Sequence, residues 1–345
     1  MITDIFARRY EHVPVRTGYG QDDARLMLQA SEMIHDRLWL GYKPEKTSEV
    51  AERCIKEVHD ALALELGRQY LSDRFWVQTT VRNGDTYRRA HTNTYAKICK
   101  KFLELVPPDT KNADQHIKER VSFVELAFRQ RMVQIETENL HLREIEQRDA
   151  QVVLAAANYR IDSLRTQNLR MNENFKLICD ELNERMRMAG YPLTYHNGMI
   201  QFATDTRITA QIEQPFWTLV SAPLWKNVDE QMKEAFDRRD RGDRTAAFHA
   251  ACALESAIKI ISDTKNWTRG TEKGASYYID NLVSQKNGRF IEVWESEMLK
   301  TLFSDVRAPF AHGPGQAPMP QLSSEQTDWA IDTAMSWIKA LIRRM

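Results

Sequence analysis

Arg307 and His312 are spaced five residues apart, where a predicted helix gives way to a glycine-containing segment. The stretch reads Val306-Arg307-Ala308-Pro309-Phe310-Ala311-His312-Gly313-Pro314-Gly315. Arginine suits phosphate because its planar guanidinium donates two hydrogen bonds and stays protonated. Histidine suits proton transfer near neutral pH. The pair therefore indicates chemistry at a phosphate group; the structural alternative is two cations that stabilise the C-terminal end of a helix.

The elements that must position this pair are predicted to be helices. Residues 228–239 form one helix, and Arg241-Gly242-Asp243 is a turn whose Asp243 caps the next helix. Further helices are expected over residues 277–283, from about 291 to Pro309, and from a Ser323 or Ser324 cap onward. Apolar side chains that recur at helical spacing are expected to face the core, namely Ala247, Ala250, Leu254, Ala257, Ile258, Ile261, Ile291, Trp294, Met298, Leu302, Val306, Trp329, Trp337 and Leu341. Residues 215–345 are thus predicted to form a helical bundle.

Two features of this region resemble one known family. The first is the R-x4-H spacing of Arg307 and His312, followed by Gly313. The second is the early helix of the region, which reads Arg241-Gly242-Asp243-Arg244-Thr245-Ala246-Ala247-Phe248-His249-Ala250-Ala251-Cys252-Ala253-Leu254-Glu255-Ser256-Ala257-Ile258-Lys259. Together they resemble the HEPN domain of bacterial abortive-infection proteins of the AbiJ-like type. Residues 1–190 resemble the variable helical N-terminal regions of the same proteins.

The resemblance implies a metal-independent endoribonuclease that needs no cofactor and acts as a homodimer or higher homo-oligomer. His312 would take the proton of a ribose 2′-OH, or protonate the 5′-oxygen leaving group, and leave 2′,3′-cyclic phosphate ends. Arg307 would stabilise the charge that develops on phosphorus. Cellular RNA such as tRNA would be the substrate, and an antitoxin or a phage-derived trigger would be a further partner.

The resemblance also assigns roles to residues around the pair. Glu255 matches the acidic position of the early helix and would orient Arg307 or line the cleft; it also stands four residues before Lys259, the spacing of an ordinary intrahelical ion pair. Gly313 completes the His-Gly context of the motif. Arg241 and Arg244 could contact RNA phosphates, although neighbouring aspartates favour self-neutralisation of this basic cluster.

Two other functions stay open on the sequence. Active members of the family commonly carry a polar residue, often Asn, directly after the arginine, and this position is Ala308. A HEPN domain that binds a nucleotide or a partner without cutting RNA is therefore the first alternative. The second is a helical scaffold or oligomerisation protein, because residues 109–189 contain no Gly or Pro.

The rest of the chain is predicted to be mostly helical as well. Residues 1–113 read as short helices and are expected to sense or regulate. Residues 114–190 form a long helical segment whose apolar spacing changes phase near residues 148–165, which suits a bend. Residues 191–214 are a linker with one small β-hairpin at Asn197-Gly198. The expected fold class is therefore mostly α.

Composition excludes several classes of protein. The 345 residues carry 48 Lys+Arg and 48 Asp+Glu, and residues 215–345 are equally neutral, with 17 of each. This balance argues against a broad basic surface that binds long nucleic acid. Any affinity for RNA should therefore come from a local pocket. No apolar run approaches about 20 residues, and no leader pattern opens the sequence, so we expect no membrane contact and a cytoplasmic location. The four cysteines show no metal-binding spacing, and no cluster of His, Asp and Glu has the spacing of metal ligands, so we expect no metal.

Overall fold

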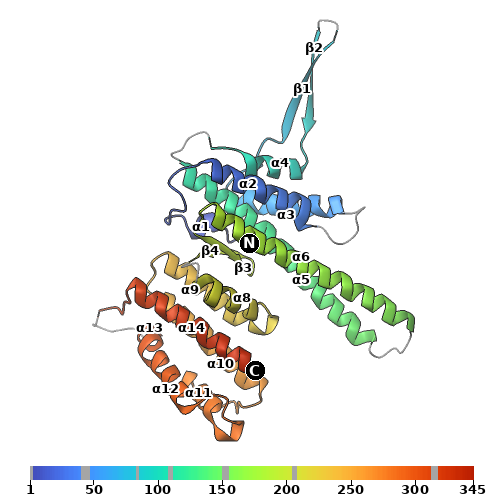
Figure 1. The fold of residues 1–345 in the computed structure, drawn as a ribbon. Coiled ribbons are helices and arrows are strands. Elements are labelled where there is room, and N and C mark those ends of the chain that lie inside the picture. Colours follow the sequence, from blue (N-terminus) through green and yellow to red (C-terminus); the bar gives the residue numbers. More distant parts are fainter. Residues whose placement is uncertain are drawn as a thin grey trace. The chain divides into compact units, whose positions relative to one another are not determined.

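The computed structural model describes residues 3–39, 47–82, 85–107, 112–149, 155–203, 208–311 and 318–345. The chain divides into two compact units, unit 1 (Met1–Ile200) and unit 2 (Gln201–Met345). The predicted mostly α class is confirmed (Figure 1), because helices dominate both units and the described strands pair only into two small sheets. The division at residue 200 comes earlier than residue 215, the expected start of the C-terminal bundle.

The elements that begin in unit 1 are α1 (Phe6–Arg9), α2 (Gln21–Glu32), the π-helix η1 (Met33–Leu38), α3 (Thr47–Glu65), β1 (Phe75–Arg82), β2 (Asp85–Thr92), α4 (Tyr95–Glu104), α5 (Ala113–Asp149), α6 (Ala155–Met188), β3 (Leu193–His196) and β4 (Met199–Phe202), the last of which crosses the boundary at Ile200. The first half of α5 is its centre, since residues 117–128 are all buried. Helices α1, α2 and α3 pack around this part of α5. Charged side chains occur even here, and they are paired: Glu125 is fully buried and accepts from Arg9 and Arg129.

Helices α5 and α6 form an antiparallel pair (Figure 1). Phe128 contacts Phe175, whereas Glu146, later in α5, pairs with Arg165, earlier in α6, so the two helices run antiparallel. The predicted bend falls between the two helices, and residues 150–154 lie outside the described part of the chain. The long segment therefore packs on itself within one chain.

Two hairpins are present where the sequence predicted one. The predicted hairpin is confirmed as β3 and β4, with Asn197 and Gly198 at positive φ of 41° and 85° between the strands. The second is the antiparallel pair β1–β2, within residues 1–113, which were expected to form short helices. Its second strand was missed because residues 85–92 are polar and charged and lack the apolar alternation that marks a half-buried strand.

The elements of unit 2 are η3 (Thr209–Glu213), α8 (Gln214–Val220), η4 (Pro223–Trp225), α9 (Lys226–Asp240), α10 (Ala246–Thr264), α11 (Ala275–Val283), η5 (Gln285–Asn287), α12 (Val293–Thr301), η6 (Leu302–Arg307), α13 (Ala308–Ala311) and α14 (Ser324–Arg344). Helix α10 is the centre, because it packs on α9, α14, η6 and α11. Its alanines let these neighbours approach closely, and Ala250, Leu254, Ala257 and Ile261 are buried as predicted.

Three residues of unit 2 that were predicted to face the core do not. Trp294, Met298 and Trp329 are exposed, at 60%, 53% and 58%, although their spacing suggested the core. The inward face of α14 is instead that of Ala330, Ile331, Ala334, Met335, Ile338 and Leu341, because spacing alone does not say which of two apolar stripes on one helix finds a neighbour.

Pro309 was expected to end the helix that begins near residue 291, and it does not. The π-helix η6 follows α12 directly and passes into α13, where Pro309 is the second residue. Proline removes one helical hydrogen bond here, where the π-helix η6 passes into α13, without ending the helix. Ser323 caps α14, with its Oγ accepting from the N–H of Gln326, as one of the two serines was predicted to do.

Candidate functional site

One face of α10 collects the polar side chains of unit 2 that surround Arg307. Phe248, Cys252, Glu255 and Lys259 are spaced four, three and four residues apart, so helical geometry places them in one row. The opposite face of α10 is buried in the core. The alanine-rich side of α10 therefore packs in the core, and the opposite side carries the row of residues next to Arg307.

Arg307 reaches this row from η6, the π-helix that packs on α10. A π-helical turn is wider than an α-helical turn, and such turns occur often at functional positions. Arg307 is the last residue of η6. The helix continues past Arg307 into α13, so Arg307 lies within a continuous helical stretch.

The central contact of the site is the ion pair between Arg307 and Glu255. Nη2 of Arg307 lies 2.7 Å from Oε2 of Glu255, and Nζ of Lys259 lies 2.9 Å from Oε1 of the same carboxylate. Glu255 is 6% exposed, whereas the Arg307 side chain keeps 28% of its surface in contact with solvent. Two cations therefore pair with one buried carboxylate, so the three side chains together carry a net positive charge, and the cations are the part exposed to solvent.

Two further residues of the row contact Arg307. Its guanidinium carbon lies 5.8 Å from the centroid of the Phe248 ring, within the range of a cation–π interaction. Burial raises the pKa of the Cys252 thiol, and a hydrogen bond from Arg307 offsets part of that rise. Nε of Arg307 is buried and has no hydrogen-bond partner in the part of the chain that the structure describes.

Glu255 was the member of this row that the sequence singled out, and the structure brings it to Arg307. Glu255 contacts both residues that the sequence associated with it, since it pairs with Arg307 and also with Lys259 four residues on. Phe248 and Cys252 were missed. Their spacing relative to Glu255 was the available signal, because residues three and seven apart share a helix face.

His312 and Gly313 lie outside the described residues, so the structure does not place them. Helix α10 carries a described histidine, His249, next to Phe248 in the sequence. The centroids of the two rings are 5.4 Å apart, and the rings meet edge to face. Burial lowers the pKa of His249, and the positive charge of Arg238 lowers it further. His249 is therefore held in its neutral form near pH 7.

Arg241 and Arg244 lie at the turn between α9 and α10 and are exposed. The neighbouring arginines at the end of α9 are paired with acidic side chains: Arg238 pairs with Glu234 and Asp243, and Arg239 pairs with Asp240 at 2.7 Å. Nε of Arg241 donates to the carbonyl of Asp237 at 2.9 Å. Neither Arg241 nor Arg244 contacts the Arg307 row through an ion pair of the described residues.

The described residues offer neither a metal site nor a membrane span. Within the described ranges no group of three or more His, Cys, Asp and Glu side chains is arranged to hold a metal ion. Among those residues no helix has both the length and the apolar character needed to cross a membrane.

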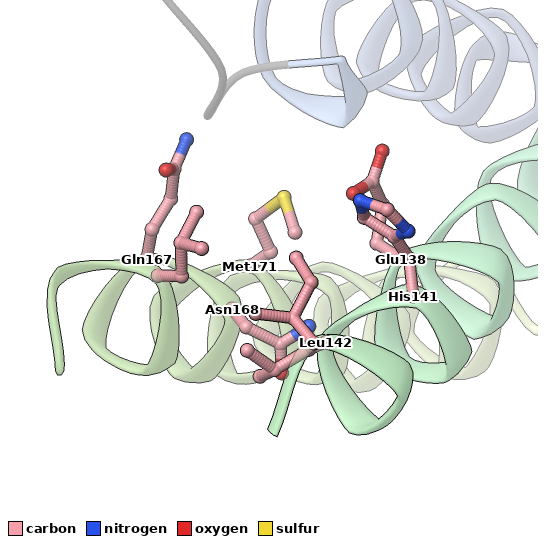
Figure 2. Close-up of a pocket in the computed structure, with 8 residues that line it drawn as sticks. Glu138, His141, Leu142, Gln167, Asn168 and Met171 are labelled. Carbon is pink, nitrogen blue, oxygen red and sulfur yellow. The ribbon is translucent and has the colours of Figure 1, made fainter. Parts of the chain in front are cut away.

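A small pocket of about 30 Å³ lies between α5 and α6 (Figure 2), lined by Glu138, His141, Leu142, Ile145, Leu164, Gln167, Asn168 and Met171. A volume of this size holds a water molecule or two and no nucleotide. None of the predicted site residues lines it.

Comparison with known proteins identifies the family of the chain. Residues 4–218 match AbiJ N-terminal domain 4, a domain of abortive-infection proteins. The chain belongs to this AbiJ-like family. The match covers unit 1 and ends within α8, so it does not reach α10 or Arg307. Searches of the curated proteins and of the solved structures found no match.

Proposed function

We propose that this AbiJ-like protein is a metal-independent endoribonuclease of abortive infection, whose catalytic residues are Arg307 and His312. The observation that carries the proposal is the ion pair of Arg307 with the buried Glu255. It holds a permanently charged, partly exposed guanidinium in one orientation, which is what stabilisation of a developing phosphorane charge requires. The family of the N-terminal region supports the abortive-infection role.

In the proposed mechanism, His312 removes the proton from a ribose 2′-OH, and the 2′-oxygen attacks the adjacent phosphorus. Arg307 stabilises the extra negative charge on the phosphoryl oxygens. The 5′-oxygen of the next nucleotide then leaves with a proton, and the products are a 2′,3′-cyclic phosphate and a 5′-hydroxyl. Acid–base help of this kind contributes about 10²–10⁴-fold to a rate. Glu255 does not touch the substrate and is a positioning residue for Arg307.

We further propose that the protein acts as a homodimer. Helix α12 leads directly into η6, and its exposed face carries Trp294 and Met298. Large exposed apolar side chains in one patch are typical of interaction surfaces. A two-fold axis near this face would bring two Arg307 side chains toward one RNA loop.

The test is RNA cleavage by the purified full-length protein in EDTA, with sequencing of the RNA ends. We expect 2′,3′-cyclic phosphate ends from the wild type and a loss of at least about 100-fold in rate for His312→Ala and for Arg307→Ala. Lys300→Ala is the matched control, since Lys300 on α12 pairs with Asp280 away from the row. Full-rate cleavage by either active-site variant would refute the mechanism.

A non-catalytic HEPN module is the second candidate, and Ala308 favours it. The residue after Arg307 has only a methyl group and cannot donate or accept a hydrogen bond toward a substrate. On this alternative the wild type cleaves no RNA, and Arg307→Ala instead weakens binding of a nucleotide or a partner protein. The scaffold alternative is weaker, because α5 packs on α6 of its own chain.

A further inference from the structure

The β1–β2 hairpin of unit 1 is a two-stranded ribbon with both faces in solvent. Figure 1 shows it extending away from the helices of unit 1 beyond α4. Its side chains from Phe75 to Val81 are all exposed, including Trp76 at 42% and Val77 at 58%. An isolated two-stranded ribbon buries little apolar surface, so its exposed aromatic rings do not contribute to a core. Such rings are typical of a binding surface.

The pairing of the strands sorts these side chains onto two faces. Opposite residues in the register share a face, and so do residues two apart along a strand. One face, called here the Trp76 face, is made of Trp76, Gln78 and Thr80 with their cross-strand partners His91, Arg89 and Tyr87. Ring, cation and ring therefore follow one another at two-residue steps of about 6.8 Å along β2.

Contacts on the Trp76 face already pair rings with a cation. The rings of Trp76 and His91 stack at 4.6 Å with 20° between their planes, and Nζ of Lys97 lies 4.8 Å from the Trp76 centroid. Nε2 of His91 and Oε1 of Gln78 are 3.1 Å apart. Tyr87, near the far end of the ribbon, is 57% exposed.

The cations of the ribbon differ from the other basic clusters of the chain. Arg238 and Arg239 of unit 2 are tied to acidic neighbours. Arg88 and Arg89 make no ion pair with any carboxylate in the described part of the chain, and both are exposed. Arg89 is the one of the two that shares a face with the stacked rings of Trp76 and His91. In a protein with zero net charge, an exposed arginine that pairs with no described carboxylate and lies beside stacked rings is suited to a nucleotide, which carries both a negative phosphate and a flat base.

We propose that the Trp76 face binds single-stranded nucleic acid, with bases stacking on Tyr87 and on the Trp76–His91 pair while Arg89 and Lys97 contact phosphates. Stacking on aromatic side chains together with cations along the backbone is how proteins bind single strands without reading sequence. A duplex offers its phosphates but not its ring faces, so it would not use Tyr87. The site lies in unit 1 and is independent of cleavage by Arg307 and His312.

The base of the ribbon is anchored well enough to carry such a site. The N–H of Asn93 donates to the carbonyl of Arg74 at 2.7 Å, and its Nδ2 donates to the carbonyl of Asp73 at 2.7 Å. Lys101 of α4 pairs with Asp73 at 2.6 Å. Substitutions at Tyr87, Arg88 or Arg89 leave these contacts intact.

The test compares two adjacent arginines on opposite faces. Arg89 is opposite Gln78 on the Trp76 face, whereas Arg88 is opposite Thr79 on the other face. Affinity of the full-length protein is measured by fluorescence anisotropy for a 2′-O-methyl RNA 15-mer, a DNA 15-mer of the same sequence and the corresponding duplex. The 2′-O-methyl strand cannot be cut through its 2′-oxygen, so the result does not depend on the proposed nuclease activity.

We expect Tyr87→Ala to weaken single-strand binding about tenfold and Tyr87→Phe to retain it. Arg89→Gln should weaken binding about tenfold and lower the salt dependence of log Kd by about 0.7, and Arg88→Gln should have a clearly smaller effect. Circular dichroism confirms that each variant is folded. Equal losses for the two arginines, or wild-type affinity of Tyr87→Ala, would overturn the proposal. So would a change of oligomeric state in Tyr87→Ala with unchanged affinity, because a second copy would then cover this face.

Discussion

Arg307 and Glu255 join η6 to α10 through an ion pair of 2.7 Å, in which the carboxylate is buried and the guanidinium is partly exposed. A buried carboxylate needs its charge balanced by hydrogen-bonded partners. Glu255 finds them in Arg307 and Lys259. The arrangement fixes the orientation of Arg307 while leaving part of it accessible, so the role of Glu255 can be separated from that of a residue that touches substrate.

Glu255→Gln should lower the turnover number for RNA cleavage about 10- to 100-fold with little change in KM, because Arg307 stays charged but loses its fixed orientation. The measurement is steady-state cleavage of a fluorogenic RNA. Lys259→Gln is the matched control, since it leaves the Arg307–Glu255 pair in place, and it should cost less than about threefold. A Glu255→Gln enzyme with normal turnover would show that Glu255 serves only to hold the two helices together.

Glu125→Ala should destabilise unit 1 by about 3–5 kcal/mol, because it leaves the buried Arg9 without its buried partner and the N–H of Ile200 without its acceptor. Glu125 is fully buried, lies 2.5 Å from Arg9 and 2.7 Å from Arg129, and accepts from the N–H of Ile200 at 2.6 Å. Urea unfolding of the full chain measures the change. Glu144→Ala, which removes an exposed partner of Arg148, should stay within about 0.5 kcal/mol of wild type. Similar costs for both would contradict the argument.

The sequence predicted the fold best where one face of a helix is buried. The stripe of α10 and the Asn197-Gly198 hairpin were found because helical spacing and a two-residue turn are local signals. The ribbon's second strand was not found, since its residues meet solvent on both faces and carry no alternation. Trp294 and Trp329 were predicted to be buried but are exposed. Their helical spacing did not distinguish the core from the surface, because large apolar side chains also occur on the surfaces of proteins.

At the candidate site, Arg307 and Glu255 were identified from the sequence, and the structure shows that they form an ion pair. Glu255 and Arg307 are 52 positions apart, and only the packing of η6 on α10 joins them. The contribution of Lys259 to the same carboxylate follows from i,i+4 spacing, but its sharing with Arg307 depends on that tertiary contact. His312 stays a prediction from the motif.

The exposed face of α12 gives a prediction about assembly. Trp294→Ala should convert the proposed homodimer to a monomer at micromolar concentration, because a large exposed ring is the usual anchor of an interface. Sedimentation velocity measures the mass. Leu64→Ala is the matched control, since Leu64 of α3 is 71% exposed and lies in unit 1. A Trp294→Ala protein with an unchanged sedimentation coefficient would place the interface elsewhere or show that none exists.

Asp332 of α14 gives a prediction about pH. Burial raises the pKa of its carboxyl from 3.8 to about 6, and the negative charges of Glu213 and Asp328 add to that rise. The folded state therefore binds this proton more tightly than the unfolded state does, so the contribution of Asp332 to stability falls as the pH rises from about 4 to about 6. Near pH 7.5 the ionised carboxylate is a cost.

Asp332→Asn should remove that cost and raise the free energy of unfolding at pH 7.5 by about 1 kcal/mol, a value reduced to allow for the partial exposure of Asp332. At about pH 4 the carboxyl is largely protonated in the folded protein, so the gain should disappear. Thermal unfolding of both proteins at the two pH values measures the difference. Asp280→Asn, which breaks the exposed pair with Lys300, should not stabilise at either pH. A gain for Asp332→Asn that is equal at both pH values would rule out ionisation of Asp332 as its cause.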